Sequence, residues 1–201
     1  MIAAVVLAAG RATRFGSPKQ LARVGGRALV QRAVDAAEGG GVDVVVVVLG
    51  HVAERIEREL SLPRNARIVV NPAFAEGQST SLRAGIRALP PEAGAAVILL
   101  ADQPGVTPDD VRAVVGAHAA TGARIVRARY RGTAGHPVLI TRALFPEVER
   151  ATGDAGARDV LRDHAGEIVE VGIDRDPPPD VDTPGDLPAA RRDVSRPDNS
   201  G

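Results

Sequence analysis

The sequence predicts an α/β fold, a three-layer sandwich whose central sheet is mostly parallel with an antiparallel edge. Three short apolar runs, at residues 2–9, 42–49 and 95–101, are typical of strands buried on both faces. Segments with helical spacing of apolar residues alternate with these runs through the first 120 residues. Such alternation favours parallel strands joined by right-handed helical crossovers.

The elements of the first half follow from apolar spacing and turn residues. Residues 10–19 are expected to form a loop, because they hold two glycines, a serine and a proline. Helices are expected over 28–38, 52–60 and 79–89, and a short strand over 66–70. Ser79 or Thr80 is the expected N-cap of the third helix, and Thr107 followed by Pro108 predicts the start of a fourth.

The alternation becomes less regular after residue 120. The segments 123–130 and 136–140 predict two strands close together, an antiparallel pair at one edge of the sheet. A helix over 157–164, a strand over 167–173 and a short helix from Thr183 are expected to follow. With neither a repeat nor an internal linker, we expect residues 1–192 to form one domain and 193–201 a disordered tail.

Composition and charge exclude several classes of function. The 201 residues include 25 basic and 25 acidic side chains and 2% aromatics, so neither nucleic acid nor a membrane surface is expected as a partner. The absence of cysteine excludes disulfides, thiolate metal sites and cysteine nucleophiles. It also fits a reducing compartment, and we expect no signal peptide or membrane span and a cytoplasmic location.

The first candidate site is the loop after the first strand. It contains Gly10, Arg14, Gly16 and Lys19, and Lys19 is the only lysine among the 25 basic residues. Backbone amides in such a loop can surround phosphate oxygens while the cations neutralise them. The loop lacks the Gly-Lys-Ser/Thr ending of a Walker motif and the Gly-x-Gly of a dinucleotide fingerprint. A single retained lysine suggests a site that needs a compact ammonium charge. The alternative is chance, since one lysine has to stand somewhere.

Two acidic positions are candidate metal ligands. Asp102 follows the buried run 95–101 directly, where a carboxylate can hold Mg²⁺ together with phosphate oxygens. A turn-forming role is the alternative, since Gln103 and Pro104 come next. Asp182 is either a second ligand or an acid near a helix start that Thr183 caps, and from the residues alone capping is favoured.

Two further groups of polar residues carry weaker signals. The segment from Asn71 to Ser81 offers an amide and small hydroxyls at a helix N-terminus, which suits a phosphate or a nucleobase edge. The histidines at positions 51, 118, 136 and 164 are dispersed, so no zinc site is expected, although His136 is compatible with a ligand contact. No Gly-x-Ser-x-Gly elbow marks a serine nucleophile.

These segments together resemble the MobA-like nucleotidyltransferases, and more closely their molybdenum cofactor cytidylyltransferase (MocA-like) branch. The resemblance runs in order from residue 2 to residue 187. It is carried by LAAGRATRFGSPKQL, VVVVVLGH, NPAFAEGQSTSLRAGI, LLADQPGV, GHPVLI, DAGARDVL and DVDTPGDL. Guanylyl-transferring relatives more often have a double glycine in the first loop and methionine in place of Gln103, so Ala9-Gly10 and Gln103 favour cytidylyl transfer.

The resemblance implies the Rossmann-like fold of nucleotide-diphospho-sugar transferases and a role for each matched residue. Lys19, Arg14 and Asp102 would be catalytic, Asp102 would bind Mg²⁺, and Asp182 would be a second metal ligand. The nucleotide would contact Leu7, Ala8, Ala9, Gly10, Arg14, Lys19, Asn71, Gly77, Gln78 and Ser79. The acceptor would contact Gln103, His136, Asp154 and Gly156.

The implied reaction transfers CMP from CTP to molybdopterin or its molybdenum form and releases pyrophosphate. The implied partners are these two substrates and a client molybdoenzyme or its maturation chaperone. Three alternatives stay open: transfer to a sugar phosphate or another phosphorylated acceptor, a family member repurposed as a flavin- or NAD(P)H-dependent oxidoreductase, and a non-catalytic cofactor carrier.

Overall fold

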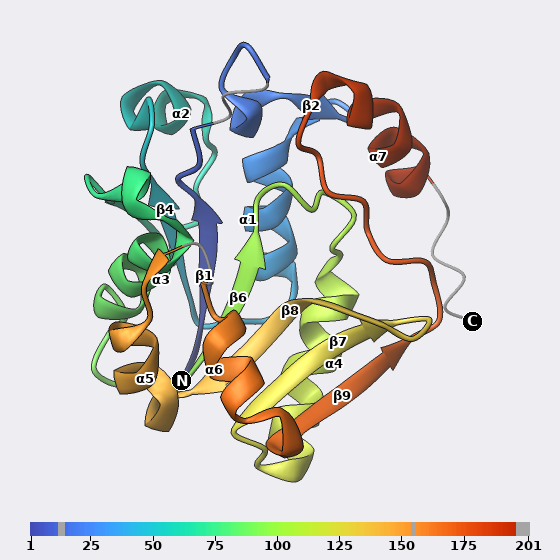
Figure 1. Ribbon diagram of the computed structural model, residues 1–201. Coiled ribbons are helices and arrows are strands. Elements are labelled where there is room, and N and C mark those ends of the chain that lie inside the picture. The colour runs from blue at the N-terminus through green and yellow to red at the C-terminus, as the bar shows by residue number, and fades with distance from the viewer. Residues whose placement is uncertain (12–14, 154–155, 196–201) are drawn as a thin grey trace.

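A mixed sheet divides the protein into three layers (Figure 1). The computed structural model describes residues 1–11, 15–153 and 156–195. Within these residues the main sheet has seven strands in the order β5-β4-β1-β6-β8-β7-β9. They are β1 (Ile2–Ala8), β4 (Val44–Leu49), β5 (Ala66–Val70), β6 (Ala95–Leu100), β7 (Ile125–Tyr130), β8 (Thr133–Thr141) and β9 (Ile168–Ile173). The predicted fold class is confirmed.

Only one strand of the described sheet runs against the others. β1 pairs parallel with β4 and with β6, and β4 pairs parallel with β5. β8 pairs antiparallel with both β6 and β7, whereas β7 and β9 are parallel. The expected antiparallel pair is therefore present on one side of the sheet, but β9 lies beyond it as the outermost strand. The alternating exposure of β9 is typical of such a position.

Helices cover both faces of the sheet (Figure 1). The helices are α1 (Leu29–Gly39), α2 (Ala53–Glu59), α3 (Gln78–Arg87), α4 (Pro108–Thr121), α5 (Phe145–Arg150), α6 (Arg158–Asp163) and α7 (Leu187–Val194). α1 and α4 pack on one face, where Ala4 and Val6 of β1 point, and α3, α5 and α6 pack on the other, where Val5 and Leu7 point. β1 is therefore apolar at every position because both of its faces are buried.

Smaller elements complete the fold near the chain's last helix. β2 (Arg23–Val24) and β3 (Arg27–Ala28) form a short hairpin. Val24 packs there with Leu29, Val181 and Ala190 in a minor core. None of the described helices is long and apolar enough to cross a membrane.

The structure corrects three details of the predicted elements. α3 begins at Gln78 after Gly77, whose φ of 118° suits glycine, so neither Ser79 nor Thr80 is the N-cap. α5 was not predicted, since its six residues are too short for a clear helical period. α7 ends at Val194, so its last two residues lie within the range expected to be a disordered tail. The predicted cap at Thr107 is confirmed as part of a capping box.

Two helical glycines give a matched test of the packing between helix and sheet. A Cβ at Gly85 of α3 would collide with Val5 and approach the Val48 side chain to 3.0 Å. We expect Gly85→Ala to lower the free energy of unfolding by about 1–3 kcal/mol through overpacking. Gly116 of α4 is exposed with nothing within 4 Å of such a Cβ, so Gly116→Ala should raise it by about 0.5–1 kcal/mol. Urea unfolding of both variants measures the difference, and equal effects would contradict this packing.

Candidate functional site

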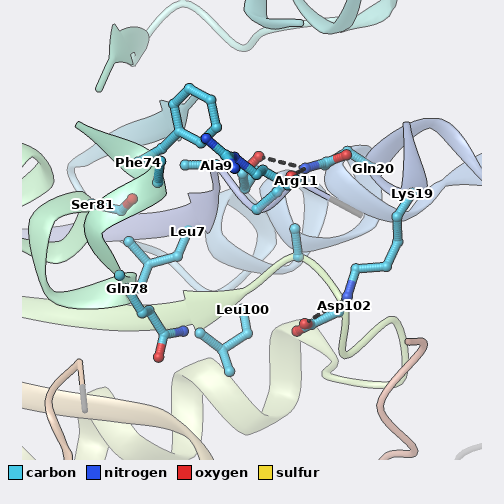
Figure 2. Close-up of a pocket in the computed structure, with 15 residues that line it drawn as sticks. Leu7, Ala9, Arg11, Lys19, Gln20, Phe74, Gln78, Ser81, Leu100 and Asp102 are labelled. Carbon is cyan, nitrogen blue, oxygen red and sulfur yellow. Dashed lines mark hydrogen bonds and ion pairs between the residues drawn. The ribbon is translucent and has the colours of Figure 1, made fainter. Parts of the chain in front are cut away.

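A pocket of about 290 Å³ opens at the carboxyl ends of β1 and β6 (Figure 2). Open parallel sheets bind ligands at this position. The pocket is lined by Leu7, Ala8, Ala9, Gly10, Arg11, Lys19, Gln20, Phe74, Ala75, Gly77, Gln78, Ser81, Leu100, Ala101 and Asp102. Eight residues predicted as site residues are among them: Leu7, Ala8, Ala9, Gly10, Lys19, Gly77, Gln78 and Asp102.

The buried side-chain amide of Gln20 holds the turn that follows β1. The Nε2 of Gln20 donates to the carbonyl oxygens of Ala8 at 2.9 Å and Gly10 at 2.7 Å. With two carbonyls satisfied in this way, the backbone leaves the end of β1 in a fixed direction. Gln20 belongs to a short 3-10 helix, Lys19–Leu21, so the same turn of chain also fixes Lys19.

Lys19 bridges two carboxylates that are far apart in the sequence. Its Nζ lies 3.1 Å from Asp102 Oδ2 and 3.1 Å from Asp182 Oδ1. Figure 2 shows the lysine side chain reaching down to Asp102 along one side of the pocket. The Lys19 side chain is only 14% exposed, whereas those of Asp102 and Asp182 are 31% and 48% exposed. One cation therefore already contacts both predicted metal ligands.

The described groups around Lys19 carry more negative than positive charge. Burial opposes the charged form of Lys19, but the carboxylates of Asp102 and Asp182 outweigh it and raise the pKa of the ammonium group. Asp180 stands nearby, and burial together with the charges of Asp102 and Asp182 raises its pKa. Among the described residues, two carboxylates therefore contact the ammonium group and a third lies near it, and this excess of negative charge suits a further cation.

The two bridged carboxylates fit a divalent metal that is also bound by substrate. Asp102 Oδ1 is buried and has no hydrogen-bond partner within the described residues. No group of three His, Cys, Asp or Glu side chains is placed to hold a metal in that same part of the chain. Mg²⁺ uses one or two carboxylates and completes its coordination with waters and phosphate oxygens. Asp102 and Asp182 are thus the described residues that could hold it.

The wall opposite Lys19 is aromatic and was not predicted. The Arg11 guanidinium lies 5.4 Å from the centre of the Phe74 ring, and the His51 ring lies 6.0 Å from it on a tilted plane. Gly50 permits this arrangement, since a Cβ there would lie 2.7 Å from both the Ala9 carbonyl oxygen and Phe74. Little in the sequence indicated that Phe74 lines a site, because a single aromatic residue in the segment before a helix usually packs against the fold.

The segment before α3 divides into residues that line the pocket and residues that support it. Gly77 and Gln78 line it. Asn71 is buried instead, and its Nδ2 donates to Thr80 Oγ1 at 2.8 Å and Ser81 Oγ at 3.0 Å. Ser79 is fully buried, and its hydroxyl has no partner within the described structure. The predicted nucleotide contacts of Asn71 and Ser79 are therefore not part of the pocket wall in this structure.

The three predicted acceptor residues that the structure describes, Gln103, His136 and Gly156, are not among the residues that line the pocket. Gln103 donates through Nε2 to Asp180 Oδ1 at 2.8 Å. Burial lowers the pKa of His136 to about 4 against the opposing charge of Asp102, so its imidazole is neutral at neutral pH. Gly156 lies against Gln78, because a Cβ there would be 2.7 Å from Gln78 Oε1. Arg14 and Asp154 lie outside the described residues.

His118, His164 and Thr183 behave as packing or capping residues. His118 Nδ1 lies 2.9 Å from the carbonyl oxygen of Ala123, at the end of α4. His164 sits between Glu147 and Glu167 at the end of α6, away from the pocket lining. Thr183 forms a capping box with Asp186, so capping does not require Asp182.

Comparison with known proteins gives a curated relative that matches most of this chain over most of its own length. A protein named nicotine blue oxidoreductase, from Paenarthrobacter nicotinovorans, is 35% identical over 170 residues. The match covers 80% of this chain and 81% of the relative.

Solved structures match over nearly the whole chain. The crystal structure of Rv0371c from Mycobacterium tuberculosis H37Rv superposes with a TM-score of 0.85 at 31% identity, covering 95% of this chain and 97% of that one. Its complex with manganese gives a TM-score of 0.80 at 30% identity, with 95% and 98% coverage. Mth528, a nucleotidyl transferase from Methanothermobacter thermautotrophicus, gives a TM-score of 0.79 at 25% identity, covering 96% of this chain and 97% of that one.

The family of this chain is shown by a family model that matches most of the sequence rather than one motif. The model of the MobA-like NTP transferase domain matches residues 4–168. That range includes most of β1, the glycine loop, Lys19, the pocket wall at 74–78, β6 and Asp102. The chain therefore belongs to the MobA-like NTP transferase family of nucleotidyltransferases.

Proposed function

We propose that the protein is a Mg²⁺-dependent nucleotidyltransferase that transfers CMP from CTP to molybdopterin or its molybdenum form. The observation that carries this proposal is the contact of Lys19 with both Asp102 and Asp182 at the mouth of the pocket. Such a transfer brings several anions together, so the site needs cations and metal-binding carboxylates more than a nucleophilic side chain.

The residues have distinct tasks in the proposed reaction. A phosphate oxygen of the acceptor attacks the α-phosphorus of CTP, and the bond to the β-phosphate oxygen breaks as pyrophosphate leaves. The backbone amides after Ala9 would bind the triphosphate, and Lys19 would neutralise its charge. Asp102 and Asp182 would hold Mg²⁺, which supplies charge neutralisation and polarises a phosphoryl oxygen. The acceptor is already anionic, so no strong general base is required.

The metal and base assignments have separate support. Rv0371c, which was solved in complex with manganese, is 30% identical to this chain in a match that covers 95% of it, and this favours a divalent cation. The choice of cytosine depends on the motif resemblance at Ala9-Gly10 and Gln103. The choice of a molybdopterin acceptor depends on the same resemblance, and the neighbouring His136, Gly156 and Gln103 would face it.

A second candidate function has an observation of its own. The relative that matches 80% of the chain is named an oxidoreductase, so the cleft of this chain could serve redox chemistry on an aromatic compound. The aromatic wall at Phe74 would then contact that compound. Lys19 between two carboxylates has no evident task in such a reaction, and for this reason nucleotidyl transfer is preferred.

Pyrophosphate release distinguishes these functions. The purified protein is incubated with Mg²⁺, molybdopterin and either CTP, GTP, ATP or UTP. Release with CTP alone is the expected result and would establish the reaction and its base together. Release only after sugar phosphates replace molybdopterin would correct the acceptor. Absence of release under every condition, together with NADH- or flavin-dependent reduction of an aromatic compound, would favour the second candidate.

A further inference from the structure

Asp102 and Asp182 lie on two loops that meet at the pocket. Asp102 belongs to the loop between β6 and α4, and Asp182 to the segment that follows β9. The backbone N–H of Val181 donates to the carbonyl oxygen of Asp102 at 2.9 Å. A side-chain bond from Gln103 to Asp180 joins the same two loops at 2.8 Å. The relative position of the two carboxylates therefore depends on how the loops are held together.

Arg175, which is not part of the pocket lining, contacts both the loop of Asp102 and the helix that follows this loop. Arg175 lies on the segment that carries Asp182. Its Nη2 donates to the carbonyl oxygen of Gly105 at 3.0 Å and also contacts Asp110 Oδ2. The Asp110 side chain is only 4% exposed, and its Oδ2 also accepts the backbone N–H of Thr107 at 2.8 Å.

The guanidinium group of Arg175 is restrained on its flat face as well. It lies 4.9 Å from the centre of the Tyr130 ring. Tyr130 is fully buried, and its hydroxyl donates to the carbonyl oxygen of His136 at 2.6 Å. A planar guanidinium can stack and donate in its plane at the same time, which an ammonium group cannot do.

The Asp102 loop is also held from its other side. The Nε of Arg32, in α1, donates to the carbonyl oxygen of Pro104 at 2.9 Å. Gly105 is buried against Asp193 of α7, and a Cβ at this position would collide with that carboxylate. The loop therefore has little freedom to shift while Arg175 remains in place.

We propose that Arg175 is a positioning residue that sets the separation of the Asp102 and Asp182 carboxylates by joining their two loops. It is not among the residues that line the pocket, so it acts through the loops rather than on substrate. The task of the carboxylates rests on the proposed function, whereas the joining of the loops does not. Outer residues that orient metal ligands typically change metal affinity or activity by about 10–100-fold.

The test uses a double variant that leaves no unpaired charge. Arg175→Met alone would strand the buried Asp110 carboxylate and could unfold the protein, so it is combined with Asp110→Asn. Arg112→Met with Asp109→Asn is the matched control, because Arg112 also contacts a carbonyl, that of Gly39, and a carboxylate on α4, but at the surface. Arg175→Lys keeps the charge opposite Asp110 and provides a second variant that is expected to fold.

Two readouts separate the positioning role from the proposed reaction. Mn²⁺ binding, followed by electron paramagnetic resonance with and without CTP, is expected to weaken about 10–100-fold in the double variant and less in Arg175→Lys. The second readout is the rate at which an N-hydroxysuccinimide ester acylates Lys19 at one pH, followed by peptide mass spectrometry. This rate is expected to rise several-fold in the double variant. Lys19 is the only lysine, so the signal is specific. The control variant should match wild type in both.

The outcomes are distinct. The positioning role would be overturned if the folded double variant kept wild-type Mn²⁺ affinity and wild-type Lys19 acylation. If the double variant does not fold, the same result for Arg175→Lys would overturn it. Wild-type protein that binds no Mn²⁺ would contradict the proposed metal-dependent function. In that case the Lys19 acylation rate would still decide whether Arg175 holds the carboxylates in place.

Discussion

Lys19→Ala is expected to lower kcat/KM for pyrophosphate release by about 10³-fold, because a lost cation at a phosphoryl-transfer site costs about 4 kcal/mol of the barrier. The side chain lies between two carboxylates at the pocket mouth, 14% exposed and 3.1 Å from each. Both carboxylates remain partly exposed, so their loss of a partner should be tolerated by solvation. Steady-state kinetics with CTP, together with a thermal melt, measures the effect.

The variant Lys19→Arg tests whether the site needs an ammonium group rather than any positive charge. The guanidinium is planar and wider than an ammonium group, and its donors point in fixed directions. It cannot take the place of one compact charge between Asp102 and Asp182, so we expect this variant to stay close to Lys19→Ala in kcat/KM. Arg64→Ala, which removes one charge from an exposed turn, should retain wild-type activity. Turnover near the wild-type rate in folded Lys19→Ala would remove Lys19 from the mechanism.

The strands and Asp102 could be predicted because their signals are local. A buried strand is a short run of apolar residues between turn residues, and β1, β4 and β6 each have that pattern. Asp102 follows such a run directly, so its position at the end of a strand could be predicted from the sequence. Lys19 stood out because every other basic residue is arginine.

The partnership of Lys19 with Asp182 could not be predicted in the same way. The two residues are 163 positions apart, and they meet because β9 adds to the far side of the sheet and the chain then returns to the pocket. Arg175 had no signal either, since it stands next to a proline-rich turn and its guanidinium group contacts segments that are distant in the sequence. Such contacts depend on the tertiary fold, which apolar periodicity does not specify.

The segment before α3 shows how a local pattern can predict the wrong helix cap. Asn71, Ser79 and Thr80 are residue types that cap helices and bind ligands, so the sequence favoured both roles. In the structure Gly77 turns the chain into the helix with a φ of 118°. Thr80 Oγ1 then lies 2.8 Å from the Gly77 carbonyl oxygen and accepts from Asn71. Asn71 and Thr80 thus stabilise the turn from inside, while Gly77 and Gln78 line the pocket.

Asp102→Asn is expected to reduce kcat/KM by about 10³-fold, mainly through loss of metal binding. The substitution keeps the shape of the side chain and removes one negative charge next to Lys19 and Asp182. Raising the Mg²⁺ concentration should restore part of the activity, because the remaining carboxylate still attracts the cation. Asp182→Asn should have a smaller effect, about tenfold, since its side chain is more exposed. Asp163→Asn, on the surface of α6, is the control.

The stability of the Asp102 variant distinguishes a functional residue from a structural one. Asp102 Oδ1 is buried without a partner among the described residues, so the carboxylate is partly desolvated in the fold. Replacing it by the neutral amide relieves this desolvation but also removes one of the two carboxylates that offset the burial of Lys19, so the free energy of unfolding should change by less than about 1 kcal/mol. Urea unfolding of wild type and Asp102→Asn, both without metal, measures this. A variant that is inactive and clearly less stable would instead mean that Asp102 supports the fold through its contact with Lys19.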